Sequence, residues 1–269
     1  SFKEVIEEAA FHYASQVQIY RLAGGYSLIC VRDGRNYLLT PEPEEVEESK
    51  SSSGSGAGGV FGYYKNSKAS DTFDASAYNI SCFVNSENAG GIFGLLESSG
   101  SFTVKDAKVT SVNVPTGETA ANIKIDSYGG IVGKYTASSL TDSLVIDNPT
   151  VTASISVKPT AATYSYGGLV GSLTATSYIK VDSATVTMKN SDGKEYAGGI
   201  IANAGDFGSF IDIRGNVKIT TSNAMAGGGV VGAITSGVVR LAGVTDVSGV
   251  VTNTNPLHGQ LVGYRGNAL

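Results

Sequence analysis

The stretch Gly129-Gly130-Ile131-Val132-Gly133 decides the fold, because variants of it recur along the chain. The other copies begin at Gly58-Gly59, Gly90-Gly91, Gly167-Gly168, Gly198-Gly199, Gly228-Gly229 and Gly259-Gln260. Their spacing is nearly constant, with longer steps on either side of the copy at Gly129. Internal repeats with a period of about 20–50 residues are typical of solenoids, propellers and arrays. The chain beyond residue 58 is therefore expected to consist of stacked, equivalent units.

Apolar residues alternate with polar ones after each copy of the motif. The first such stretches are Phe102-x-Val104, Ile179-x-Val181, Ile211-x-Ile213 and Val239-x-Leu241, and further stretches contain Val109, Ile155, Val186 and Val217. Alternation with a period of two predicts strands with one buried face, and no helical periodicity appears between residues 58 and 269. The sequence therefore predicts an all-β chain: a right-handed parallel β-helix, or β-solenoid, of about seven coils with about three strands per coil.

The motif residues have predictable roles in such a solenoid. Coils lie ~4.8 Å apart, so Ile131, Leu169, Ile200 and Val230 should occupy successive rungs and point inward. The paired glycines supply either positive φ or close backbone approach at a corner. Two longer units predict loops around Pro115–Gly117 and Pro149–Pro159.

The glycine motif resembles the GLUG-motif repeats, which occur in bacterial surface and secreted proteins, including adhesin-like proteins and some immunoglobulin A peptidases. The resemblance covers roughly residues 54–269. It implies an extracellular or cell-surface β-helix that serves as a stalk or scaffold, and it supplies no catalytic residues.

Residues 1–50 differ from the repeats. Apolar positions predict a helix over residues 2–13, and Val17–Leu22, Tyr26–Arg32 and Asn36–Thr40 predict a three-stranded meander. This small α+β segment is interpreted as a cap on the solenoid end, with an independent recognition module as the alternative. Residues 51–57 form a Ser/Gly linker before the repeat domain at 58–269, and residues 1–50 are either native or an artificial fusion.

Composition excludes several classes of function. Only 16% of the residues are charged and the formal net charge is −5, which argues against nucleic-acid binding. No apolar run approaches the ~20 residues of a membrane span, and the chain does not open on a signal peptide. No cofactor or metal is expected, because His12 and His258 lack metal-ligand spacing. Cys30 and Cys82 are either two thiols or one disulfide.

Three tyrosines are candidate ligand-binding residues. Tyr128 and Tyr166 directly precede a glycine pair, and Tyr196 lies one residue further from its pair. Stacked on neighbouring coils, their rings would either form an exposed ladder that binds sugar or peptide, or support the corner by packing.

Catalysis is the less favoured interpretation. Asp142 and Asp182 could meet on adjacent coils as paired carboxylates, but Arg214 and Arg240 have no evident aspartate group beside them. Alanine at Asp142, Asp182 or Asp212 is therefore expected to leave fold and affinity nearly unchanged.

The sequence thus predicts a non-enzymatic scaffold or adhesin-like module that presents loops and a polar face to a glycan or protein partner. A carbohydrate-active lyase or hydrolase is the first alternative. The second is a filament subunit that assembles end to end, since the tail after Gly259–Gly263 is too short to cap the last coil.

Overall fold

The computed structural model describes residues 17–22, 25–32, 35–39, 56–113, 125–139, 141–155, 165–174, 178–190, 196–204, 209–222, 227–234, 237–243, 245–250, 259 and 261–265. The chain divides into two compact units, Ser1–Lys50 and Ser51–Leu269. The described residues of both units are all-β, without a helix. None of them belongs to a helix that is long and apolar enough to cross a membrane.

The first unit contains the predicted meander. Strands β1 (Val17–Leu22), β2 (Gly25–Arg32) and β3 (Arg35–Leu39) form an antiparallel sheet in the order β1-β2-β3. The helix predicted over residues 2–13 lies outside the described residues, and so does most of the linker at 51–57. The role of this unit as a cap stays a prediction.

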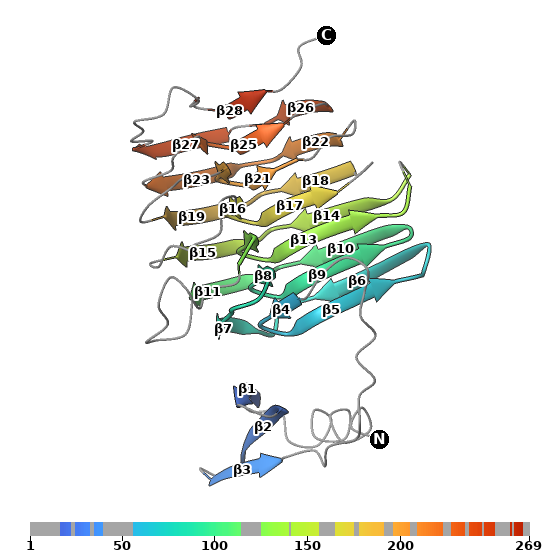
Figure 1. The fold of residues 1–269 in the computed structure, drawn as a ribbon, viewed down its shortest axis with the longest axis vertical. Helices are drawn as coiled ribbons and strands as arrows, with labels where there is room; N and C mark the ends of the chain where they lie inside the picture. Colours follow the sequence, from blue (N-terminus) through green and yellow to red (C-terminus); the bar gives the residue numbers. More distant parts are fainter. Residues whose placement is uncertain are drawn as a thin grey trace. The chain divides into compact units, whose positions relative to one another are not determined.

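The second unit is a parallel β-solenoid made of four sheets, whose strands follow one another coil by coil (Figure 1). The glycine sheet contains the short strands that end in the first motif glycine: β4 (Gly56–Gly58), β8 (Asn88–Gly90), β12 (Ser127–Gly129), β16 (Ser165–Gly167), β20 (Tyr196–Gly198) and β24 (Gly227–Gly228). The second sheet follows in the chain and contains β5 (Phe61–Asn66), β9 (Phe93–Ser98), β13 (Val132–Ala137), β17 (Val170–Thr174), β21 (Ile201–Asn203), β25 (Val231–Ile234) and β28 (Val262–Arg265). Each of the seven motif copies thus contributes one strand to the second sheet.

The other two sheets contain the alternating stretches. The third sheet consists of β6 (Ser70–Asp74), β10 (Ser101–Lys105), β14 (Ser143–Asp147), β18 (Tyr178–Asp182), β22 (Ser209–Arg214) and β26 (Gly237–Ala242). The fourth sheet consists of β7 (Asn79–Phe83), β11 (Lys108–Asn113), β15 (Thr150–Ile155), β19 (Thr185–Asn190), β23 (Val217–Ser222) and β27 (Thr245–Val250). A full coil therefore has four strands and not three, because each motif takes part in two of them, one in the glycine sheet and one in the second sheet.

The predicted motif ladder is confirmed. The backbone N–H of Ile131 donates to the carbonyl oxygen of Leu169, Leu169 donates to Ile200, and Ile200 donates to Val230, at 2.9–3.0 Å. All four side chains are fully buried, so they point inward as expected. Equivalent apolar residues therefore stack on one another through the core of the solenoid.

The motif glycines are required for close approach and not for unusual backbone angles. None of those in the described coils has positive φ. A Cβ atom on Gly129 would overlap the carbonyl oxygen of Val132, and one on Gly130 would overlap that of Gly168 in the next coil. The sequence left positive φ and close backbone approach as alternatives. The structure has close approach, within the motif at Gly129 and between coils at Gly130.

Positive φ occurs instead at the turn between the third and fourth sheets. One residue of that turn has a left-handed conformation in five successive coils: Asp106, Asn148, Ser183, Gly215 and Gly243. The sequence did not predict this recurring turn, since only two of the five residues at the left-handed position are glycine. The loop predicted at Pro149–Pro159 is wrong in its first half, because Thr150–Ile155 form β15. The rest of that loop and the loop predicted around Pro115–Gly117 lie outside the described residues.

Candidate functional site

Tyr128 and Tyr166 stack on neighbouring coils, but they face the interior of the solenoid. They are partners in the pairing of β12 with β16, and their side chains are 1% and 3% exposed. The two rings contact edge to face at 5.7 Å, and the Tyr128 hydroxyl donates to the carbonyl oxygen of Val112 at 2.9 Å. Of the two alternatives for these tyrosines, the exposed ladder is wrong and packing in the interior is what the structure has, because the position before the glycine pair lies on the inner side of its strand.

Tyr196 does not join the other two tyrosines. Its partner on β16 is Ser165 and not Tyr166, so it is one position out of register and on the opposite side of the strand. The half-buried Tyr196 ring stacks on Tyr264 of β28, with ring centroids 6.4 Å apart. The three predicted tyrosines therefore do not form one surface.

The paired carboxylates considered for hydrolysis are also separated. Asp142 directly precedes β14, whereas Asp182 ends β18 and has Asp147 as its partner on β14. Asp142 is buried and accepts hydrogen bonds from the backbone N–H groups of Ser138 and Ser139, at 2.9 and 2.7 Å. Asp142 thus holds the turn before β14, and we no longer expect its substitution to leave the fold unchanged.

A different group of residues comes together on the outer side of the third sheet. The neighbours of Asp212, Ile211 and Ile213, are fully buried and face the core, so alternation places Asp212 on the outer side of β22. Pairing in register sets Asp212 beside Lys180 of β18 and beside Arg240 of β26. Asp212 is nevertheless 0% exposed, because side chains from three strands cover it.

Those side chains saturate the carboxylate of Asp212. Oδ2 accepts hydrogen bonds from Arg214 Nε at 2.7 Å, Arg240 Nη2 at 2.9 Å and the Tyr178 hydroxyl at 3.1 Å. Oδ1 accepts one from Arg240 Nε at 3.2 Å. Hydrogen bonds from Arg240, then from Arg214 and Tyr178, hold the pKa of this carboxyl well below its usual range, although desolvation opposes them. Asp212 is therefore a fixed anion with little affinity for a proton.

Aromatic rings complete this group. Tyr178 and Phe210 are partners in register, and their rings stack with centroids 5.5 Å apart and planes 17° apart. The Arg240 guanidinium carbon lies 5.3 Å from the Phe210 ring centroid, within the range of a cation–π contact. We call Tyr178, Phe210, Asp212, Arg214 and Arg240 the arginine cluster.

The arginine cluster overturns the expectation that Arg214 and Arg240 have no aspartate beside them. It also removes the expectation that alanine at Asp212 would be neutral for the fold. The signal was present in the sequence, since Asp212 and Arg240 occupy equivalent positions in the alternating stretches of successive units. Aligning the units by their strands, and not only by their glycines, would have found it.

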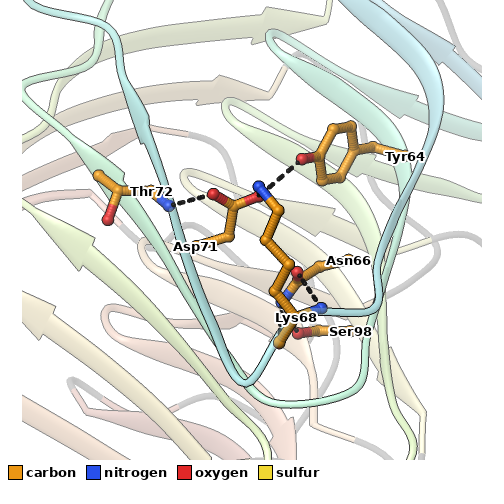
Figure 2. A network of polar contacts seen from close by, with 6 residues as sticks. All are labelled: Tyr64, Asn66, Lys68, Asp71, Thr72 and Ser98. Atoms are coloured by element: carbon orange, nitrogen blue, oxygen red, sulfur yellow. Dashed lines mark hydrogen bonds and ion pairs between the residues drawn. The ribbon is translucent and has the colours of Figure 1, made fainter.

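A second polar group lies in the first coil, where Asp71 is the central residue (Figure 2). Asp71 Oδ2 accepts hydrogen bonds from the Tyr64 hydroxyl at 3.0 Å and from Lys68 Nζ at 3.2 Å, and Oδ1 accepts one from the Thr72 backbone at 3.1 Å. The buried Asn66 bonds to Ser98 of the next coil and to the backbone of Lys68. These bonds hold the turn between β5 and β6, so we interpret the group as structural.

Metal and thiol chemistry find little support in the described part of the chain. No three His, Cys, Asp or Glu residues of that part lie close enough to hold a metal ion. Cys82 is a free, half-buried thiol that donates to the carbonyl oxygen of Gly91 at 3.7 Å, and burial raises its pKa to about 12. Cys82 is therefore a protonated packing residue and not a reactive thiolate.

Comparison with known proteins adds no functional assignment. No family model, no curated protein and no solved structure matches the chain. The functional argument therefore depends on the residues described above.

Proposed function

We propose that the chain is a non-enzymatic extracellular or cell-surface scaffold that binds a glycan or protein partner. The observation that carries this proposal is the arginine cluster, in which two half-exposed guanidinium groups stand on a rigid parallel sheet. Their side chains are 42% and 52% exposed, while the carboxylate that orients them is completely buried. Such a site binds through donors that are fixed before the partner arrives.

The state of Asp212 favours binding over catalysis. A general base must be able to accept a proton, and its pKa must lie near the working pH. Four hydrogen bonds occupy the Asp212 carboxylate, and its lowered pKa makes it a poor proton acceptor. A second carboxylate on this face, Asp182, is paired with Lys180 at 3.3 Å.

The resemblance of the glycine motif to GLUG-motif repeats supports a bacterial surface role as a stalk or adhesin-like module. The solenoid agrees with such a role, because each coil rests on its neighbours and the sheets present flat, rigid faces. A solenoid of this type displays a binding surface in a fixed position and needs no conformational change to do so.

Incubation with acidic and neutral polysaccharides tests this proposal. Binding is followed by affinity electrophoresis, and cleavage is followed by the release of reducing ends and unsaturated products. We expect binding without cleavage. Cleavage by the wild-type chain that is lost in the Asp212→Asn variant would show that the chain is an enzyme.

A further inference from the structure

The arginine cluster carries surplus positive charge on an otherwise acidic chain. The chain has a formal net charge of −5. At the arginine cluster, two guanidinium groups share the single carboxylate of Asp212. Asp182 lies beside Arg214 in register and also forms an ion pair with Lys180 at 3.3 Å, so Lys180 offsets the negative charge that Asp182 brings to this face. The local field therefore favours an anionic ligand.

Each guanidinium has donors left for such a ligand. Arginine has five N–H donors in a planar fork. Arg214 and Arg240 use Nε and Nη2 to bind Asp212, and within the described residues neither Nη1 amino group has a hydrogen-bond partner. Because both groups hold one buried carboxylate, their positions are fixed relative to each other. Pairs of arginine donors in a fixed geometry suit planar carboxylates.

An apolar stripe runs beside these donors. Tyr178, Phe210 and Val238 are successive partners in register on the outer side of β18, β22 and β26. Val238 is 56% exposed, which is high for a valine in a strand. Tyr178 and the Arg240 guanidinium cover the faces of the Phe210 ring, so the stripe offers a ligand its ring edges and the Val238 side chain. A ligand that combines carboxylates with apolar C–H groups would contact the arginine donors and this stripe at once, and a polymer of hexuronic acids has both.

The sheet geometry disfavours an acidic peptide. Extended peptides commonly bind by adding a strand to a free sheet edge. On this face β22 is paired on both sides, with β18 and β26, so its backbone groups are not free. Recognition at the arginine cluster must therefore use side chains alone. A polymer of hexuronic acids suits this site because each ring holds its carboxylate at a fixed place beside apolar C–H groups, so less conformational freedom is lost on binding than with a flexible acidic peptide.

We infer that the arginine cluster binds the carboxylates of an acidic polysaccharide, with Arg214 and Arg240 as donors and the stripe from Tyr178 to Val238 against the sugar rings. This inference rests on the proposed binding function and specifies its ligand class.

Isothermal titration of the full chain with polygalacturonate tests the inference, with dextran as the neutral polymer and polyglutamate as the acidic peptide. Arg240→Gln removes one donor fork, and Lys218→Gln removes the same charge from an exposed position on the fourth sheet. We expect Arg240→Gln to weaken binding of polygalacturonate about 10-fold, which corresponds to the loss of one charge-assisted contact. Lys218→Gln should change the affinity less than about 2-fold.

Circular dichroism and thermal unfolding verify that each variant is folded. Arg214→Gln is an independent test should Arg240→Gln fail to fold, and it should also weaken binding about 10-fold. No binding of polygalacturonate, an equal loss in Arg240→Gln and Lys218→Gln, or equal or tighter binding of dextran or polyglutamate would overturn the inference. Binding of a neutral glycan that is insensitive to Arg240→Gln would overturn it and leave the proposed function intact, whereas cleavage of the polymer would overturn the proposed function itself.

Discussion

Two aromatic pairs in this solenoid each join register partners on adjacent coils, but one pair lies in the core and the other on the outer side of a sheet. Tyr128 and Tyr166 are partners on adjacent coils with ring centroids 5.7 Å apart, and Tyr178 and Phe210 are partners with centroids 5.5 Å apart. The first pair packs edge to face in the core, and the second stacks face to face on the outer side of the third sheet. The side of the strand on which an aromatic residue lies therefore decides whether it packs in the core or can be reached by a partner.

Truncation of the inner pair should have the largest effect on stability. Tyr128→Ala removes a completely buried ring and leaves the Val112 carbonyl without this donor, so we expect a loss of about 3–5 kcal/mol in the free energy of unfolding. Urea denaturation measures this loss. Tyr128→Phe is the matched control, because it keeps the ring and should cost only about 1 kcal/mol. Equal effects of the two variants would mean that the hydroxyl, and not packing, dominates.

Substitution of Asp212, which accepts a hydrogen bond from Tyr178 of the outer pair, should have an intermediate effect on stability. Asp212→Ala removes the acceptor of three side chains, but the two half-exposed arginines can turn to water, so we expect a loss of about 2 kcal/mol. Asp182→Ala, which breaks a more exposed pair with Lys180, should change the free energy of unfolding by less than about 0.5 kcal/mol. An Asp212→Ala variant with the same free energy of unfolding as the wild type would show that the arginine cluster does not stabilise the coil.

The contribution of Asp212 should depend on pH in one direction. Its pKa is lowered in the folded chain, so its stabilisation is complete above the unfolded value of about 3.9 and is lost as the pH falls through the folded value. We therefore expect the stability difference between wild type and Asp212→Asn to be constant from about pH 7 to about pH 5 and to shrink only below about pH 4. Denaturation curves at several pH values measure it. A difference that grows on acidification would contradict the assigned ion pairs.

Loss of the Tyr178 hydroxyl should have the smallest effect. Tyr178→Phe keeps the stack on Phe210 and removes one of several hydrogen bonds to Asp212, so we expect a loss of about 1 kcal/mol. The control is Tyr63→Phe, because the Tyr63 hydroxyl donates to Glu97 at the exposed surface, and its loss should cost less than about 0.5 kcal/mol. A loss at Tyr63 as large as that at Tyr178 would remove the distinction between the two sites.

The sequence was sufficient to predict the architecture because the solenoid repeats its own pattern. The glycine motif predicted the stacked coils, and alternation predicted strands such as β18 and β22. The same logic could not choose between an exposed and a packed position for Tyr128 and Tyr166, since proximity to the motif does not say which side of the strand a residue occupies. Here the three-residue strand of each motif directs them inward.

The arginine cluster was missed because it depends on register between units of unequal length. The step along the chain from Asp212 to Arg240 is shorter than the step from Gly198 to Gly228 or from Gly228 to Gly259. The turns absorb the difference, and only strand pairing shows that Asp212 and Arg240 are partners. In the same way, the left-handed turn residues become recognisable only after the coils are aligned.

The central claim is that Arg214 and Arg240, fixed by the buried Asp212, form a binding surface for carboxylates. A crystal structure of the chain with an oligogalacturonate tests this claim most directly. We expect carboxylate oxygens of the oligosaccharide at about 2.7–2.9 Å from guanidinium nitrogens of both arginines, with a sugar ring against Val238. An oligosaccharide bound on another face of the solenoid, or one whose carboxylates contact neither arginine, would contradict it.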